Sequence, residues 1–264
     1  GATGGKGVGE GTGRGDSWAV VGNSGSRGGV RQESVTAIAE VQNAGVQGVM
    51  ITGDRKDTAV AIATEAGMIT KDSDIVMASD ELGQIDDEEL KKRLPNSRVI
   101  ARALPSDKSR LVRVAQELDL VGGMTGDGVN DSPALKRADV GFAMGGGTEV
   151  AKEASEIVIM ADNFSSIDNA ILYGRTIFNR IRKFIIFQLT INVAAVLISF
   201  ISPLLGIENP LTSTQILWVN LVMDTLAALA FGGEPALKRF MKEKPKRRDE
   251  NIVSPYMWSS ILTG

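Results

Sequence analysis

Two hydrophobic patterns divide the chain near residue 160. Before that point, short apolar runs alternate with segments whose apolar residues recur every three or four positions. In ESVTAIAEVQNAG, Val35, Ile38 and Val41 are three residues apart and the pattern stops at Gly45, which is typical of a helix with a glycine stop. VQGVMITGD follows as an apolar strand that ends in a Thr-Gly-Asp turn. The alternation predicts βαβ units and therefore a parallel sheet.

The same alternation continues to residue 160. Strands are predicted at WAVV, VQGVMI, IVMA with a turn at SDEL, SRVIA, VGGMT, DVGFAM and SEIVIM, and helices at RKDTAVAIATEAG, DDEELKKRL, SRLVRVAQELD, SPALKRA and GTEVAKEA. Ligands of such sheets bind beyond the carboxyl ends of the strands. The turns in MITGD and MTGDG both fall at that edge.

Glycine dominates the first residues. GATGGKGVGEGTGRG has eight glycines and almost no apolar residues, so we predict a disordered tail over residues 1–17. The tail contains no G-x-x-x-x-G-K-[ST] pattern, so a P-loop is not expected there. A second glycine-rich patch, GNSGSRGG at 22–29, is predicted to form the loop after the first strand.

After Met160 the apolar stretches become long. An amphipathic stalk helix is predicted over 163–183, ending in a basic cluster. Phe184–Ile207 follows with no charge in 24 positions, which is long enough to span a bilayer. A turn at ENP leads to Leu211–Phe231, where Asp224 is the only charge in 21 positions. The alternative is a pair of helices buried in a large soluble core.

Charge placement predicts the orientation of the two spans. Basic residues flank both outer ends, the second of them in a loop over 232–255, while the connection between the spans has none. Both outer ends are therefore predicted to be cytoplasmic. Residues 256–264 are similar to the start of a further span.

Composition limits the chemistry. The 264 residues have 29 Lys and Arg against 32 Asp and Glu, a net charge of −3, which argues against a nucleic-acid binder. Cysteine and histidine are both absent, so the chain has no disulfide, no Cys/His zinc site and no histidine base. Carboxylates, lysine, hydroxyls and backbone amides must do any chemistry.

The loop GGMTGDGVNDSPAL, residues 122–135, has the groups that phosphoryl transfer needs. Asp127 can supply a carboxylate oxygen to Mg²⁺, and Gly126 and Gly128 allow main-chain amides to approach closely. Asn130 can donate to a phosphoryl oxygen, and Asp131 can orient its neighbours. The loop therefore predicts a phosphate and metal site.

A second turn and a lysine add to this site. Thr52, Gly53 and Asp54 offer a hydroxyl, an accessible amide and a carboxylate at the end of a parallel strand, and Lys108 offers an ammonium group. Each aspartate alone is better explained as the end of a strand or the cap of a helix. Two such turns and a lysine in one sheet favour a functional site.

Polar residues also occur inside the predicted spans, where they are expensive and usually functional. From a rise of about 1.5 Å per residue, Asn192, Asp224 and Asn220 lie roughly 12, 10 and 16 Å from the cytoplasmic side. Such oxygen ligands suit a hard cation such as Ca²⁺, although Mn²⁺ uses similar oxygens. The alternative is hydrogen bonding between spans, which suits Gln188 and Gln215 better than Asp224.

These segments resemble one family. MITGD, ARALPSDK, MTGDGVNDSPAL and GTEVAKEASEIVI closely resemble the phosphorylation domain of P-type cation ATPases. FIIFQLTINVAAVLISF and QILWVNLVMDTLAALAFGGEP resemble the fifth and sixth membrane helices of the calcium-pumping, plasma-membrane-type branch. The resemblance covers about residues 30–264. It implies a partial α/β haloacid-dehalogenase-like domain with a Rossmann-like parallel sheet over 18–162, followed by an α-helical transmembrane hairpin.

The resemblance also implies roles for individual residues. Lys108, Asp127 and Asp131 would be catalytic, and Asp127 would bind the Mg²⁺ cofactor. The residues facing the phosphorylated aspartate or the phosphates of ATP would be Thr52, Gly53, Asp54, Arg102, Lys108 and Asn130. The ligands of the transported Ca²⁺ would be Asn192, Asn220 and Asp224. Ala195 stands where two-calcium pumps have a glutamate, so one Ca²⁺ per cycle and proton counter-transport are expected.

Parts of such a pump are missing from these residues. Asp107-Lys108-Ser109 follows Leu-Pro-Ser and opens a helix, so it matches the family's later lysine motif and not the phosphorylated D-K-T-G-T. The partners implied are the lipid bilayer, the actuator and nucleotide-binding domains, and the first four membrane helices. We therefore expect the C-terminal part of an ATP-driven Ca²⁺ transporter in a bacterial plasma membrane, with its phosphorylation domain cytoplasmic. The alternatives are a soluble phosphatase of the same fold and a catalytically inactive membrane module for binding or assembly.

Overall fold

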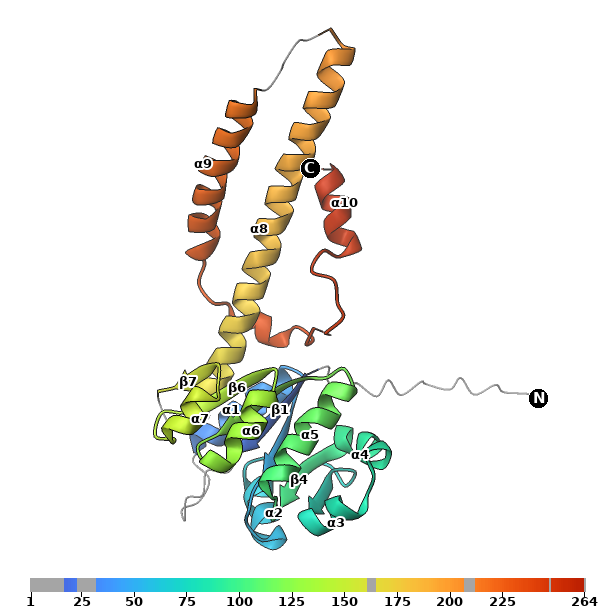
Figure 1. Cartoon of the computed structure of the whole chain (residues 1–264), viewed down its shortest axis with the longest axis vertical. Helices are drawn as coiled ribbons and strands as arrows, with labels where there is room; N and C mark the ends of the chain where they lie inside the picture. The colour runs from blue at the N-terminus through green and yellow to red at the C-terminus, as the bar shows by residue number, and fades with distance from the viewer. Residues whose placement is uncertain (1–16, 23–31, 161–164, 207–211, 247, 264) are drawn as a thin grey trace, which may run out of the picture. The chain divides into compact units, whose positions relative to one another are not determined.

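The computed structural model describes residues 17–22, 32–160, 165–206, 212–246 and 248–263 (Figure 1). Two compact units make up the chain. The first contains the described residues up to Asp168 together with Lys242–Arg248, and the second contains Asn169–Met241 and the residues from Asp249 onward. Residues 1–16 of the predicted tail and 23–29 of the predicted loop lie outside the described residues, as does the turn at ENP, whereas Ser17 and Gly22 belong to β1 and not to the tail and loop.

The first unit is built on seven parallel strands in the order β3-β4-β2-β1-β5-β6-β7. This arrangement confirms the predicted parallel α/β fold. The strands are β1 (Ser17–Gly22), β2 (Val46–Ile51), β3 (Ile75–Ala78), β4 (Ser97–Ala101), β5 (Val121–Gly126), β6 (Val140–Met144) and β7 (Ile157–Ile159).

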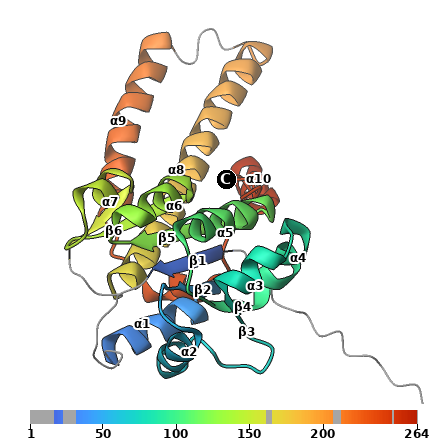
Figure 2. The same cartoon turned by 60° about the horizontal axis from the view of Figure 1, so that its bottom comes forward.

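Helices cover both faces of this sheet, with α1 and α2 on one side and α5 and α6 on the other (Figure 2). The helices are α1 (Gln32–Asn43), α2 (Lys56–Glu65), α3 (Ser79–Gln84), α4 (Asp87–Arg93), α5 (Pro105–Glu117), α6 (Ser132–Arg137) and α7 (Glu149–Glu153). Successive residues of β4 serve opposite faces, as a strand requires. Ile100 packs into the core under α5, whereas Val99 and Ala101 pack under α2.

Local chemistry explains where these helices begin and end. Gly45, with φ of +80°, follows α1, so the predicted glycine stop is confirmed. The Asp86 carboxylate accepts a hydrogen bond from the Glu89 amide and caps α4. The turn predicted at SDEL is instead the short helix α3, because Asp80 and Glu81 stabilise its first turn.

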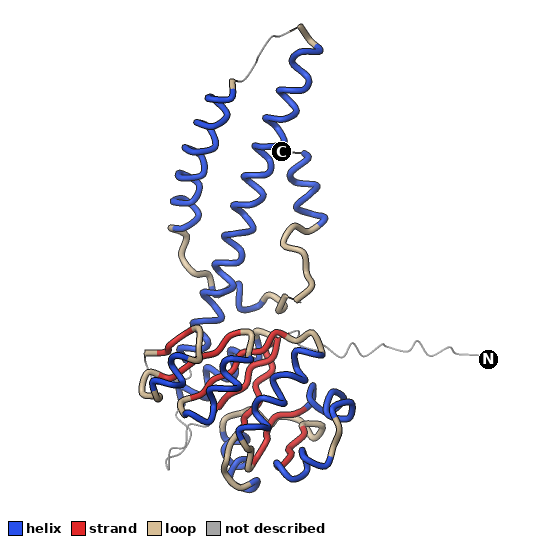
Figure 3. Tube along the Cα trace, viewed as in Figure 1, coloured by secondary structure: helices blue, strands red, loops and turns tan. Residues whose placement is uncertain are grey.

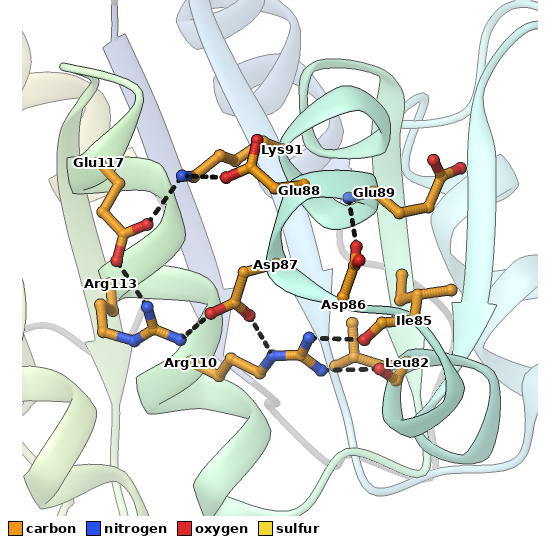
Figure 4. A network of polar contacts seen from close by, with 10 residues as sticks. All are labelled: Leu82, Ile85, Asp86, Asp87, Glu88, Glu89, Lys91, Arg110, Arg113 and Glu117. Atoms are coloured by element: carbon orange, nitrogen blue, oxygen red, sulfur yellow. Dashed lines mark hydrogen bonds and ion pairs between the residues drawn. The ribbon is translucent and has the colours of Figure 1, made fainter.

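An ionic network fastens α4 to α5 (Figure 4). Asp87 pairs with Arg110 at 2.9 Å and with Arg113 at 2.6 Å. Arg110 also donates to the carbonyl oxygens of Leu82 and Ile85, at the end of α3. One arginine thereby joins three helices.

The second unit is dominated by two long helices, α8 (Ser165–Leu204) and α9 (Ser213–Gly232), drawn in Figure 3. Both are long and apolar enough to cross a membrane. Their apolar side chains are exposed, with Phe200 at 71% and Leu229 at 70%, which the buried-core alternative does not predict. A 3₁₀ turn (Lys238–Lys242) and α10 (Pro255–Thr263) follow. The predicted stalk and first span form one continuous helix.

Candidate phosphoryl-transfer and cation sites

The carboxyl edge of the sheet brings the two Thr-Gly-Asp turns to either side of one strand. β2 ends at Ile51 and β5 ends at Gly126, and β1 lies between them and ends at Gly22. Because parallel strands present their carboxyl ends at one edge, both turns flank the end of β1.

The first turn is held by its own hydroxyl. Thr52 Oγ1 donates to Asp54 Oδ2 at 3.0 Å and accepts from the Asp54 amide at 3.1 Å. Thr52 is buried, but a Cβ on Gly53 would meet nothing within 4 Å. The turn is therefore fixed while open space remains beside Gly53.

Arg102 joins this turn through its backbone. Its amide donates to the Asp54 carbonyl at 2.9 Å, and the Ala103 amide donates to the Thr52 carbonyl at 2.9 Å. Arg102 adopts a φ of 51°, in the left-handed region that costs a non-glycine residue about 1 kcal/mol. The backbone of Arg102, an exposed residue, is therefore held beside the first turn.

The second turn is organised by Asp131. Its Oδ1 pairs with Lys108 Nζ at 2.5 Å, and its Oδ2 accepts from the amides of Asp127 and Gly128, both at 3.2 Å. Lys108 and Asp131 are both buried, at 9% and 5% exposure. A Cβ on Gly126 would lie only 2.4 Å from Asp131 Cβ, so glycine is required there. Asp131 thus fixes the main chain around Asp127.

Asp127 itself is exposed, and its carboxylate has no hydrogen bond or ion pair within the part of the chain that the structure describes. Its carbonyl oxygen accepts from the Thr148 amide at 2.9 Å, and Gly147 packs directly on its backbone. The sequence analysis missed this anchor, although the glycine run before Thr148 was a signal for it. Asn130 is exposed beside Asp127.

Asp127 fits a Mg²⁺ ion bound together with substrate. Among the described residues, no three or more acidic side chains gather into a self-sufficient metal cage. Mg²⁺ usually keeps several waters and binds through one or two carboxylates and the phosphates of a substrate. A single exposed carboxylate with no partner among the described residues is consistent with that kind of site.

In the second unit, two contacts fix how α8 and α9 meet. The rings of Phe187 and Phe231 lie edge to face, with centroids 6.1 Å apart. Lys183 Nζ contacts both carboxylate oxygens of Glu234, at 2.8 and 2.7 Å. This hydrogen bond, together with the charges of nearby arginines, lowers the pKa of Glu234. The sequence analysis did not predict the pair, because it depends on the register of the hairpin.

That register places the membrane candidates at definite levels. With a rise of about 1.5 Å per residue, Asn192 lies about 8 Å and Asp224 about 10 Å beyond the phenylalanine pair. Asn220 lies one turn further along α9. Asn192 also lines an open pocket of about 500 Å³, together with Ala195, Val196, Ser199, Phe200 and Ile216. By this estimate Asn192 and Asp224 lie at about the same distance from the phenylalanine pair.

Comparisons with known proteins agree with both units. A haloacid dehalogenase-like hydrolase family matches residues 19–139, and the C-terminus of cation-transporting ATPases matches residues 208–264. A crystal structure of a zinc-transporting PIB-type ATPase in the E2.Pi state aligns with a TM-score of 0.53 and 28% identity, covering 81% of this chain and 28% of that one. The chain is therefore part of a P-type cation-transporting ATPase.

Its relatives narrow this class. Plasma membrane calcium-transporting ATPase 4 of Homo sapiens is 44% identical over 248 residues, which are 88% of this chain and 20% of that protein. Probable calcium-transporting ATPase 6, plasma membrane-type, of Oryza sativa subsp. japonica is 46% identical over 221 residues, or 83% of this chain and 22% of that protein. The chain thus spans about a fifth of the length of these relatives, and it is similar to calcium-transporting ATPases of the plasma-membrane type. The expected bacterial origin is not supported, since these relatives are eukaryotic.

Proposed function

We propose that this chain contributes half of the phosphorylation site and part of the cation site of an ATP-driven Ca²⁺ pump. The observation that carries the proposal is the Lys108–Asp131–Asp127 arrangement, in a chain that also carries Asp224 in a membrane-length helix. A soluble phosphatase of the same fold would not need two such exposed apolar helices.

In the proposed reaction, the carboxylate of an aspartate from another part of the pump bonds to the γ-phosphorus of ATP at the edge between the two turns, while the bond from that phosphorus to the bridging oxygen breaks and ADP leaves. Lys108 places positive charge near the phosphoryl oxygens, while Asp131 holds Lys108 and the main chain of Asp127 in position. Mg²⁺ bound by Asp127 would supply further positive charge to the same oxygens.

The remaining edge residues are proposed to bind phosphate. The Thr52 hydroxyl and the Gly53 amide would contact phosphoryl oxygens, because the turn leaves Gly53 open. Asn130 and Arg102 are exposed at the same edge and would face the nucleotide phosphates. Asp54 holds the Thr52 hydroxyl in place.

The hairpin is proposed to bind the transported Ca²⁺ through Asn192, Asn220 and Asp224, with further oxygens from the other membrane helices. α8 begins at Ser165 and carries Asn192 in one continuous helix. We propose that α8 transmits rearrangement of the phosphorylation domain, on the cytoplasmic side, to the cation site.

The proposal is tested in the complete pump by Ca²⁺-dependent ATP hydrolysis. Asp224→Asn should abolish the Ca²⁺ dependence, because it removes the only charge of α9. Thr225→Val is the matched control, since the Thr225 hydroxyl bonds to the Leu221 carbonyl of its own helix. Unchanged Ca²⁺ dependence in Asp224→Asn would contradict the assignment.

Ala195 bears on the number of Ca²⁺ ions that the pump transports per ATP. It lines the pocket beside Asn192 and offers no side-chain oxygen, so one Ca²⁺ per ATP is expected, with proton counter-transport. Transport stoichiometry measured in sealed vesicles checks this expectation. Two Ca²⁺ per ATP would exclude it.

A further inference from the structure

One face of α8 carries the pocket residues and, one turn nearer the Lys183–Glu234 pair, Gln188. Asn192, Ala195 and Ser199 line the pocket, and they follow the three- and four-residue spacing of one helix face. Gln188 lies one turn before Asn192 on that same face. Gln188 therefore lies on the same face of α8 as the pocket residues, one turn outside the pocket.

Gln188 shares an unusual property with Asp224. Gln188 Oε1 and Asp224 Oδ1 are both shielded from solvent and have no hydrogen-bond partner within the described part of the chain. By contrast, Thr190 and Thr225 donate to carbonyl oxygens of their own helices. Unpaired polar atoms are costly inside a bilayer, so the two free acceptors require a partner.

Both atoms are hydrogen-bond acceptors, which limits what their missing partner can be. A carboxylate only accepts hydrogen bonds, and the buried atom of Gln188 that has no partner is its amide oxygen, which also only accepts. The missing group must therefore be a donor or a cation. Lys183 does not meet the need, because its ammonium group contacts both oxygens of Glu234.

The position of Gln188 favours a cation in transit. Gln188 lies next to Phe187, at the level where the two helices touch through Phe231. Asn192 lies about 6 Å further along α8. Gln188 is therefore between the Lys183–Glu234 end of the hairpin and the level of Asn192 and Asp224.

We propose that Gln188 is a further cation-handling residue, whose amide oxygen lines the route from the Lys183–Glu234 end to the site at Asn192 and Asp224. This inference rests on the proposed function and assigns an added residue to its hairpin. A neutral amide oxygen contacts a divalent cation without holding it as tightly as a carboxylate does. Gln188 would thus ease the loss of hydration water before the cation reaches Asp224.

The experiment measures binding of radioactive Ca²⁺ alone, and Ca²⁺ activation of ATP hydrolysis, in the complete pump in lipid nanodiscs. Gln188→Leu should raise the midpoint Ca²⁺ concentration of both curves about threefold to tenfold, because one polar contact is lost. Gln188→Glu should lower the midpoint of binding. Thr190→Val is the matched control in the same helix and should leave both midpoints unchanged.

Thermal unfolding in the presence and absence of Ca²⁺ separates this role from hydrogen bonding to another membrane helix. A cation-handling residue predicts that Gln188→Leu reduces the stabilisation that Ca²⁺ gives. If Gln188→Leu lowers the unfolding temperature without moving the Ca²⁺ midpoints, Gln188 forms a hydrogen bond to another membrane helix and the inference is overturned. If Gln188→Leu does not fold, Gln188→Asn carries the test, and an unchanged midpoint overturns the inference.

Asp224→Asn separates failure of the role proposed for Gln188 from failure of the proposed cation site. Loss of Ca²⁺ dependence in Asp224→Asn with unchanged midpoints in the Gln188 variants refutes only the role of Gln188. Persistence of Ca²⁺ dependence in Asp224→Asn refutes the proposed cation site itself, and the inference with it.

Discussion

The two candidate sites differ in how their polar groups are satisfied. At the edge of the sheet, the charged pair Lys108–Asp131 is buried and Asp131 also accepts two backbone amides. In the hairpin, Gln188 and Asp224 each keep an acceptor oxygen without a partner in the described residues. The first site is arranged before its ligands arrive, whereas the second depends on groups that other helices or a cation supply. The predictions below test this contrast.

The largest expected effect comes from breaking the buried pair. Lys108→Ala leaves the Asp131 carboxylate buried with only amide donors, which should cost about 3 kcal/mol in the free energy of unfolding. Urea unfolding of the chain in detergent, followed by circular dichroism, measures this loss. Lys56→Ala is the matched control, because the Lys56–Glu81 pair is about half exposed and should contribute less than about 1 kcal/mol. Equal losses of unfolding free energy in Lys108→Ala and Lys56→Ala would show that the buried pair contributes no more than the exposed one.

The glycines of the two Thr-Gly-Asp turns provide the next test. Gly126→Ala places a Cβ 2.4 Å from Asp131 Cβ, so we expect a loss of about 2 kcal/mol in unfolding free energy. Gly53→Ala meets nothing within 4 Å and should change stability by less than about 0.5 kcal/mol. If Gly53 approaches phosphate, Gly53→Ala will nevertheless impair ATP hydrolysis in the complete pump. Equal stability of the two alanine variants would show that Asp131 does not pack as the structure has it.

In the hairpin, replacing a polar residue is expected to increase stability, because the polar group that is removed has no partner. Asp224→Leu removes an unpaired acceptor and should stabilise the hairpin of this chain by about 1 kcal/mol. Loss of helicity during titration with a denaturing detergent measures this change. Thr225→Val should change the midpoint little, because the Thr225 hydroxyl is satisfied within its own helix. Destabilisation by Asp224→Leu would mean that the carboxylate already has a partner.

The smallest effect is expected from the partly exposed network of Figure 4. Hydrogen bonds from Arg113 and then Arg110 hold the pKa of Asp87 below its ordinary value. The stabilisation is therefore present above the unfolded-state pKa and is lost as the pH falls below about 4. Asp87→Asn should slightly lower the unfolding temperature at pH 7, and the difference between the two proteins should shrink as the pH falls below about 4. A difference in unfolding temperature that does not shrink as the pH falls below about 4 would exclude ionisation of Asp87 as its cause.

Much of the fold could be predicted from periodicity. Apolar runs and three- to four-residue spacing located the strands and helices of the α/β unit, and glycine marked the end of α1 at Gly45. The short helix α3 was predicted as a turn, because six residues carry too little periodicity to distinguish the two.

The site could be predicted only in part. The Thr-Gly-Asp turns follow apolar strands, so their place at one edge follows from the parallel sheet. The direct contact of Lys108 with Asp131 and the anchoring of Asp127 by Thr148 depend on strand order and loop packing, which local patterns do not specify. Likewise, the register of α8 on α9 depends on contacts such as Phe187–Phe231.

The most direct test of the central claim is phosphate incorporation from labelled ATP. The 264 residues contain no D-K-T-G-T sequence, so the chain alone should take up no acid-stable phosphate. The complete pump should be labelled only when Ca²⁺ is present, and its Asp224→Asn variant should not show that Ca²⁺-dependent labelling. Labelling of the chain alone, or Ca²⁺-independent labelling of the complete pump, would contradict the proposed coupling between the phosphorylation site and the hairpin.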